Sequence, residues 1–90
     1  MRLPNPKNQL AECLLELLTH KRRSRLDIMN STRMLCVTSK ITRLRLDYNL
    51  PITTHWVKWQ NKYGRMVQYG EWSLEDFNKG IEVYNKINME

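Results

Sequence analysis

The feature that most constrains the fold is an abrupt change of pattern at Pro51. The preceding segment, residues 33–48, carries apolar side chains at helical spacing, and Thr32 stands before it as a capping residue. Asn49 can adopt the left-handed conformation that commonly ends a helix, and the proline prevents continuation. Residues 52–59 are rich in β-branched and aromatic side chains, which favour strands. The sequence therefore predicts a helix that leads directly into a strand.

Two helices are expected before this one. Asn5 and Pro6 form a helix-start signal, and the leucines and cysteine that follow recur at spacings of three and four residues, which predicts a helix up to about Thr19. Ser24 stands three positions before an acid, a variant of the capping box that predicts a brief helix over residues 25–29. The order is thus helix, short helix, turn and longer helix.

After the proline, the pattern indicates a β-hairpin and a last helix. Residues 60–64 form a turn cluster and residues 65–69 a returning strand. Gly70 is expected to allow a bend or a bulge. Ser73 precedes acidic residues, which predicts a capped final helix over residues 74–88. This helix contains a glycine, Gly80, which costs about 1 kcal/mol relative to alanine in a helix.

Three motifs stand in this order along the chain: Lys40-Ile41-Thr42-Arg43-Leu44-Arg45, Tyr48-Asn49-Leu50-Pro51-Ile52-Thr53-Thr54 and Tyr69-Gly70-Glu71-Trp72-Ser73-Leu74. Their order and spacing, over roughly residues 7–74, resemble the small winged helix-turn-helix DNA-binding domains of bacteria, phages and integrated mobile elements. The acidic helix after Leu74 departs from that family's pattern.

The resemblance implies a single domain over residues 1–90, mainly α with a β-hairpin. It would be a winged helix-turn-helix with three helices and a two-stranded wing in a core of residues 7–72, plus a C-terminal helix at 74–88. The resemblance also implies DNA binding, by a transcription regulator or by a recombination accessory factor of a prophage or another mobile element. It does not separate these two roles.

Charge is unevenly distributed along the chain. Residues 1–66 hold 13 Lys and Arg against 4 Asp and Glu, whereas residues 67–90 hold 2 against 5, and the net charge is +6. A polyanion is the natural partner for such a basic segment, with nucleic acid ahead of a membrane surface. A solvated basic face that only keeps the protein soluble is the alternative, and charge alone does not decide between them.

The predicted helix over residues 33–48 has two distinct faces on a helical projection. Apolar side chains fill one arc: Met34, Val37, Ile41, Leu44 and Tyr48. The opposite arc holds small polar side chains and an arginine, which can bond base edges in the major groove or phosphates. The expected DNA-binding residues of this helix are Arg33, Thr38, Ser39, Lys40, Thr42 and Arg43.

Two residues of the same helix, Arg45 and Leu46, do not match the face of the helix on which they fall. Arg45 falls at the edge of the apolar arc, so a structural role is expected, with its stem packed and its guanidinium bonded to a carbonyl or an Asp. Leu46 falls on the polar face. It could meet a thymine methyl group or a partner subunit, but simple exposure of a leucine is common and is favoured here.

Further cations are expected to bind the phosphates of the DNA backbone. Those of the wing are Lys58, Lys62 and Arg65, and those near the second helix are Lys21, Arg22, Arg23 and Arg25. Phosphate contact is the functional interpretation for both groups. The structural alternative is that the wing cations only keep the turn soluble, and that the cations near the second helix only belong to a solvated loop.

Aromatic and sulfur side chains allow similar alternatives. Five aromatic residues could stack on single-stranded bases, but core packing is favoured for Trp56, Trp59, Tyr63, Tyr69 and Trp72. Both cysteines, Cys13 and Cys36, are expected to be buried reduced thiols. Neither His20 nor His55 lies at a zinc-ligand spacing from a cysteine, so no metal and no cofactor are expected.

Sequence-selective binding of double-stranded DNA is the leading hypothesis. The main alternative is a protein-interaction module on the same scaffold, using the acidic C-terminal helix, which could also form a homodimer through residues 74–88. No catalytic grouping supports an enzyme. A cytoplasmic location without membrane association is expected, because there is neither a signal-peptide pattern nor an apolar run long enough for a bilayer.

Overall fold

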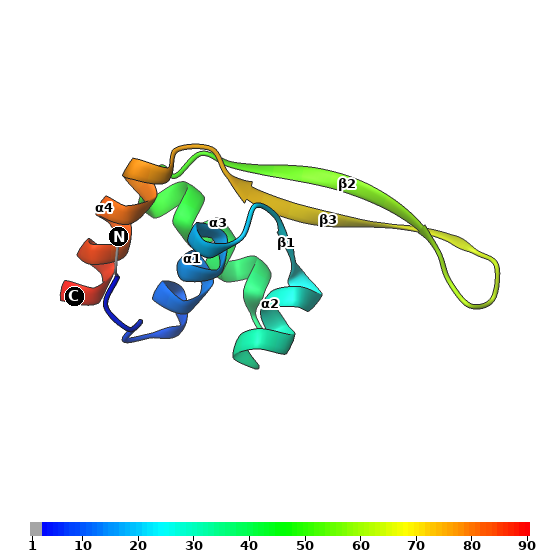
Figure 1. Ribbon diagram of the computed structural model, residues 1–90, viewed down its shortest axis with the longest axis horizontal. Coiled ribbons are helices and arrows are strands. Elements are labelled where there is room, and N and C mark those ends of the chain that lie inside the picture. The colour runs from blue at the N-terminus through cyan, green and yellow to red at the C-terminus, as the bar shows by residue number, and fades with distance from the viewer. Residues whose placement is uncertain (1–2) are drawn as a thin grey trace.

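The structure, a computed structural model, describes residues 3–90. Within them the order of elements is α1 (Gln9–Thr19), β1 (Arg23–Ser24), α2 (Arg25–Thr32), α3 (Val37–Asp47), β2 (Ile52–Gln60), β3 (Met66–Leu74) and α4 (Phe77–Met89). Figure 1 shows the helices gathered at one end, while the hairpin of β2 and β3 projects away from them. The extents of 47 × 25 × 24 Å reflect this projection.

The sheet has three antiparallel strands in the order β1-β3-β2, so the expectation of a two-stranded wing was wrong. The additional strand is short: Arg23 pairs with Trp72, and Ser24 pairs with Glu71. Two residues are too few to show the period-two alternation that reveals a strand, and their partners lie far along the chain. The pairing anchors the base of the hairpin to the segment between α1 and α2.

The hairpin is longer than the sequence indicated. It pairs without interruption from Ile52 opposite Leu74 to Gln60 opposite Met66, so Gly70 forms no bulge. Gly70 stands opposite Trp56. A Cβ atom added there would lie 3.0 Å from Thr54 Cγ2 and 3.6 Å from the ring of Trp56. The glycine thus leaves room chiefly for the methyl group of Thr54, since 3.6 Å to the ring is an ordinary van der Waals contact.

The core lies among α1, α3, α4 and the base of the sheet. It is built from Leu10, Cys13, Leu14, Leu17, Ile28, Met34, Val37, Ile41, Leu44, Leu50, Trp72, Val83, Tyr84 and Ile87. Tyr84 is fully buried, and its hydroxyl donates to the carbonyl oxygen of Pro4 at 2.6 Å. The helix α4 is therefore part of the core and not an appendage to it.

Four helix boundaries differ from the expected ones. The first helix is capped by Asn8, whose Oδ1 accepts from the N–H of Ala11 at 2.9 Å, and not by Asn5. The second runs to Thr32, beyond the expected end at 29. The last begins at Phe77, because β3 continues through the expected cap.

The start of α3 was also predicted too early. Arg33 adopts a left-handed conformation, φ 60°, and ends α2. Thr32 donates to the carbonyl of Ile28 at 2.7 Å and accepts from the N–H of Met34 at 3.2 Å, so it closes α2 and does not cap α3. The third helix therefore begins at Val37, after a turn of four residues.

The helix stop and the capping box are confirmed. Asn49 is left-handed with φ 54°, and the N–H of the buried Leu50 donates to the carbonyl of Leu44 at 3.1 Å. Ser24 Oγ accepts from the N–H of Asp27 at 3.1 Å, while the carboxylate of Asp27 accepts from the N–H of Ser24 at 3.0 Å.

In residues 3–90, no helix is both long and apolar enough to cross a membrane.

Candidate nucleic-acid interface

The helix α3 presents the two faces that its sequence predicted. Val37, Ile41 and Leu44 are buried, whereas the expected contact residues Thr38, Ser39, Thr42 and Arg43 are exposed. Arg43 makes one ion pair within the described residues, 3.6 Å from Nε to Asp47 Oδ2, and both side chains are about half exposed. Exposed pairs of this kind contribute only about 0–1 kcal/mol. The guanidinium of Arg43 is therefore able to exchange this partner for another.

Two of the expected contacts on this helix are placed differently. Arg33 lies in the turn before α3 and not on the helix. Lys40 is only partly exposed, on the flank towards α1, where its charge acts on Cys13. Burial and the nearby Glu16 nevertheless raise the pKa of Cys13 to about 12. The second cysteine, Cys36, is exposed directly before α3, so the expectation of two buried thiols was wrong for it.

A groove of about 880 Å³ lies between the helices and the hairpin. Its walls include Leu26 from α2, Thr38 and Thr42 from α3, and Trp56 and Tyr69 from the hairpin. The exposed polar face of α3 thus borders an open channel whose other wall is the sheet.

Arg45 fixes the angle between these two walls. Its Nε and Nη2 atoms donate to the carbonyl oxygen of Ile52 at 3.2 and 2.9 Å, and Nη2 also donates to Thr54 Oγ1 at 2.8 Å. The predicted structural role of Arg45, including a bonded carbonyl, is confirmed. Leu46 is exposed, as predicted.

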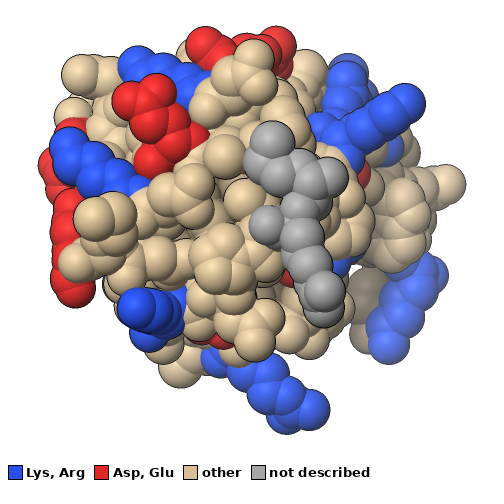
Figure 2. All heavy atoms as spheres, turned by 60° about the vertical axis from the view of Figure 1, so that its left-hand side comes forward, with Lys and Arg blue, Asp and Glu red and all other residues tan. Residues whose placement is uncertain are grey.

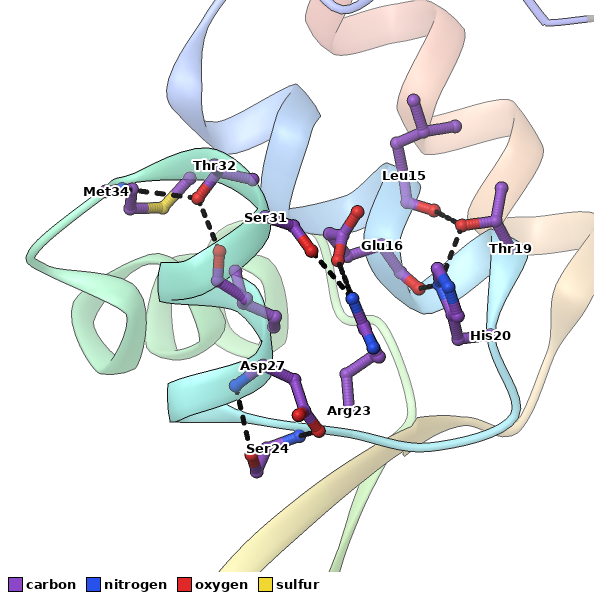
Figure 3. A network of polar contacts seen from close by, with 11 residues as sticks. Leu15, Glu16, Thr19, His20, Arg23, Ser24, Asp27, Ser31, Thr32 and Met34 are labelled. Carbon is purple, nitrogen blue, oxygen red and sulfur yellow. Dashed lines mark hydrogen bonds and ion pairs between the residues drawn. The ribbon is translucent and has the colours of Figure 1, made fainter.

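Arg23 is held inside the fold, as Figure 3 shows. Its Nη2 lies 2.9 Å from Glu16 Oε1 on α1 and donates to Ser31 Oγ on α2 at 2.7 Å. Its side chain and that of Glu16 are both about four-fifths buried. The guanidinium therefore joins β1 to two helices and is not free to bind a phosphate.

The other cations of this run differ from one another. Arg22 lies on the sheet, 3.7 Å from Glu71 Oε1, and its Nη2 donates to His55 Nδ1 at 3.2 Å. The same histidine bonds Ser73 Oγ through Nε2 at 2.7 Å. By contrast, Lys21 and Arg25 are exposed and form no ion pair within residues 3–90. Of the four cations at residues 21–25, these two are therefore the ones free of ion pairs within the described part of the chain.

The cations of the hairpin are gathered on its outer part, residues 56–69, here called the arm. Lys58, Lys62 and Arg65 are all exposed there. The tip is ordered by Asn61, whose Oδ1 accepts from the N–H groups of Tyr63 and Arg65, each at 3.0 Å. No Asp or Glu occurs in the sequence between residues 48 and 70. The arm is therefore uniformly positive.

The aromatic residues contradict the expectation of core packing. Of the five residues for which core packing was expected, Trp72 alone is buried, at 8% exposure, whereas Trp56, Trp59, Tyr63 and Tyr69 are 70%, 57%, 82% and 40% exposed. No residue from 53 to 71 is buried, because the hairpin extends past the helices that could cover it. Residue type alone could not reveal this, since burial depends on where the helices end.

Acidic side chains gather away from the arm. Figure 2 brings the left-hand side of Figure 1 forward and shows acidic side chains towards its left and upper edges, with some basic ones among them, and further basic side chains along its lower and right-hand edges. Within residues 3–90, no group of three metal-ligating side chains comes together.

No protein-family model matches the chain, and no curated protein matches it. The assignment of a function therefore depends on the side chains described above.

Proposed function

We propose that this protein binds double-stranded DNA with sequence selectivity, as a winged helix-turn-helix domain whose helix α3 enters the major groove. One observation carries the proposal: α3 turns small polar side chains and one arginine outwards, beside an open groove whose far wall belongs to the hairpin. The same hairpin carries the exposed cations Lys58, Lys62 and Arg65 outside that groove. An α-helix fits the major groove of B-DNA, and short side chains let its backbone approach the bases.

The outward side chains of α3 offer both kinds of hydrogen bond that base edges require. Arg43 supplies a fork of donors for the O6 and N7 acceptors of guanine. Ser39 Oγ donates to the carbonyl of Cys36 at 3.2 Å, and Thr42 Oγ1 donates to that of Thr38 at 3.1 Å. Their oxygen lone pairs are thereby turned into acceptors for the amino groups of cytosine or adenine.

The free cations supply contacts to phosphates. They are Lys21, Arg25, Lys58, Lys62 and Arg65, while Arg22 would first have to leave its contacts with the sheet. Each phosphate contact lowers the logarithm of affinity by about 0.9 per tenfold rise in salt. Five contacts therefore set a slope of about −4 to −5 for duplex binding.

The most plausible setting is regulation of transcription, or assistance to recombination, in a phage or a mobile element in the bacterial cytoplasm. A homodimer through residues 74–88 stays a prediction. The alternative function as a protein-interaction module is weakened, because the apolar stripe of α4 is used within the fold: Val83, Tyr84 and Ile87 are buried. Its remaining outward face is mostly polar.

Selection of bound sequences from a random duplex pool, followed by titration of the selected site, tests the proposal. Arg43→Ala should weaken binding to that site by about 1–3 kcal/mol and relax preference at one base position. Lys86→Ala on α4 removes the same charge beside Tyr48, the C-cap of α3, and leaves the exposed polar face of α3 unchanged, so it serves as the matched control. Recovery of no preferred sequence, or equal effects of the two substitutions, would show that α3 does not read DNA.

A further inference from the structure

We propose that the arm, residues 56–69, also binds single-stranded DNA or RNA by stacking unpaired bases on Trp56 and Trp59, at a site that shares its cations with the proposed duplex site. The duplex site proposed for α3 requires neither of these rings. The inference begins from their exposure, which is 70% and 57%, although both are among the largest apolar side chains in the chain. Large apolar side chains that are exposed close together often mark a binding site.

The ring of Trp56 lies beside Gly70 on the neighbouring strand. The two residues stand opposite each other in the ladder, and the Cζ3 and Cε3 atoms of the ring come within 3.6 and 3.8 Å of the position that a Cβ of Gly70 would occupy. Because glycine has no side chain, nothing at this position covers the ring, and it stays 70% exposed and accessible to a base.

Trp56 and Trp59 both line the groove between the helices and the hairpin, although they start from opposite faces of β2. Side chains of a strand alternate between its faces, so Trp56 shares a side with Thr54 and Lys58, whereas Trp59 shares the other side with Val57 and with the cross-strand Tyr69. The strand β2 is an edge of the sheet. A single nucleic-acid strand that follows this edge can therefore reach both rings.

Charge complementarity identifies the partner. Three cations, Lys58, Lys62 and Arg65, are interleaved with the aromatic rings, and no carboxylate occurs in the sequence between residues 48 and 70. Lys62 Nζ also lies 5.1 Å from the centroid of Tyr63 at the tip. Rings for the bases and cations for the backbone are the combination that binds single strands without strict sequence preference.

Two other occupants fit the arm less well. A second copy of the arm would bring like charges together, which disfavours association. A membrane surface is flat, whereas both tryptophans line the groove between the helices and the hairpin. Single-stranded nucleic acid is therefore the partner that uses all of these side chains.

The test is fluorescence anisotropy of a labelled oligothymidylate of about 16 nucleotides, a length within the range of known single-strand sites. Trp56→Ala and Trp59→Ala should each weaken its binding by about tenfold, since base stacking on one aromatic ring contributes about that much. Phe77→Ala, which removes an exposed ring from α4, should leave it unchanged. Quenching of the wild-type tryptophan fluorescence by the oligonucleotide gives a readout that needs no variant.

The outcomes separate this proposal from the proposed duplex binding. Oligothymidylate that fails to bind at low salt, or that binds both tryptophan variants as tightly as the wild type, overturns the inference even if a duplex sequence is selected. Single-strand binding that depends on the two tryptophans supports the inference. If no duplex sequence is selected in the same study, that result contradicts the proposed function but not this inference. Tryptophan substitutions that alter self-association or binding to anionic vesicles, and leave oligonucleotide binding intact, also overturn it.

Discussion

The guanidinium of Arg45, on α3, donates to the carbonyl oxygen of Ile52, on β2, through both Nε and Nη2, at 3.2 and 2.9 Å. These two residues bracket the turn at Asn49, where helix gives way to strand. The contact therefore ties the helix with the exposed polar face to the first strand of the hairpin. It sets how the two walls of the groove stand relative to one another.

Replacement of Arg45 by methionine should lower the free energy of unfolding by about 1–3 kcal/mol, because the partly buried bonds to Ile52 and Thr54 are lost while the apolar stem is retained. Urea denaturation measures the change. Arg65→Met, at an exposed position of the arm, is the control and should alter stability little. Equal stability of the two variants would show that the Arg45 fork does not stabilise the fold.

Gly80→Ala should destabilise the protein, although alanine is the better helix former. A Cβ atom at Gly80 would collide with the side chain of Leu74 and lie 3.0 Å from Leu18 Cδ2. Overpacking of this kind costs typically about 1–3 kcal/mol, which exceeds the gain of about 1 kcal/mol in helix propensity. Asn85→Ala, on the exposed side of the same helix, should be neutral or stabilising in thermal denaturation. A rise in melting temperature for Gly80→Ala would contradict the close approach of α4 to β3.

Asp27 should contribute to a loss of stability in acid. Its carboxylate accepts a hydrogen bond from the N–H of Ser24, and this bond lowers the pKa of Asp27 below its ordinary value of 3.8. A depressed pKa in the folded state means that the unfolded chain takes up the proton first. The stability that Asp27 supplies is therefore complete above the unfolded pKa and is lost as pH falls through the folded one.

Urea denaturation between about pH 3 and 6 measures this contribution. Asp27→Asn should be less stable than the wild type near pH 6 by about 0.5–1 kcal/mol, with a difference that shrinks as the pH falls. Asp47→Asn is the control, because the carboxylate of Asp47 accepts no backbone N–H bond within residues 3–90. A constant difference between Asp27→Asn and the wild type at every pH would exclude a charged capping box.

The two cysteines should differ in their reaction with a thiol reagent. Cys13 is buried, and burial raises its pKa to about 12, so it holds almost no thiolate at neutral pH. Cys36 is exposed. Native protein should therefore release one equivalent of product with a disulfide reagent and unfolded protein two, and Cys36→Ser should abolish the native reaction. Two fast equivalents from the native protein would mean that the core around Cys13 opens readily.

The sequence by itself determined the features that depend on near neighbours along the chain. The capping box of Ser24 and Asp27, the two faces of α3 and the stop at Asn49 each involve residues within a turn or two of one another, so their pattern is visible without the fold. The hairpin and the structural role of Arg45 were predictable for the same reason: the partners of Arg45 lie only seven and nine residues away.

Only the tertiary structure decided the features that depend on residues distant in the chain. The strand β1 forms because Arg23 and Ser24 meet Trp72 and Glu71, and Arg23 is buried because Glu16 and Ser31 surround it. The exposure of Trp56 and Trp59 follows from a hairpin that extends past the helices. Burial free energy is proportional to the surface that neighbours cover, and a local pattern does not say which neighbours will be there.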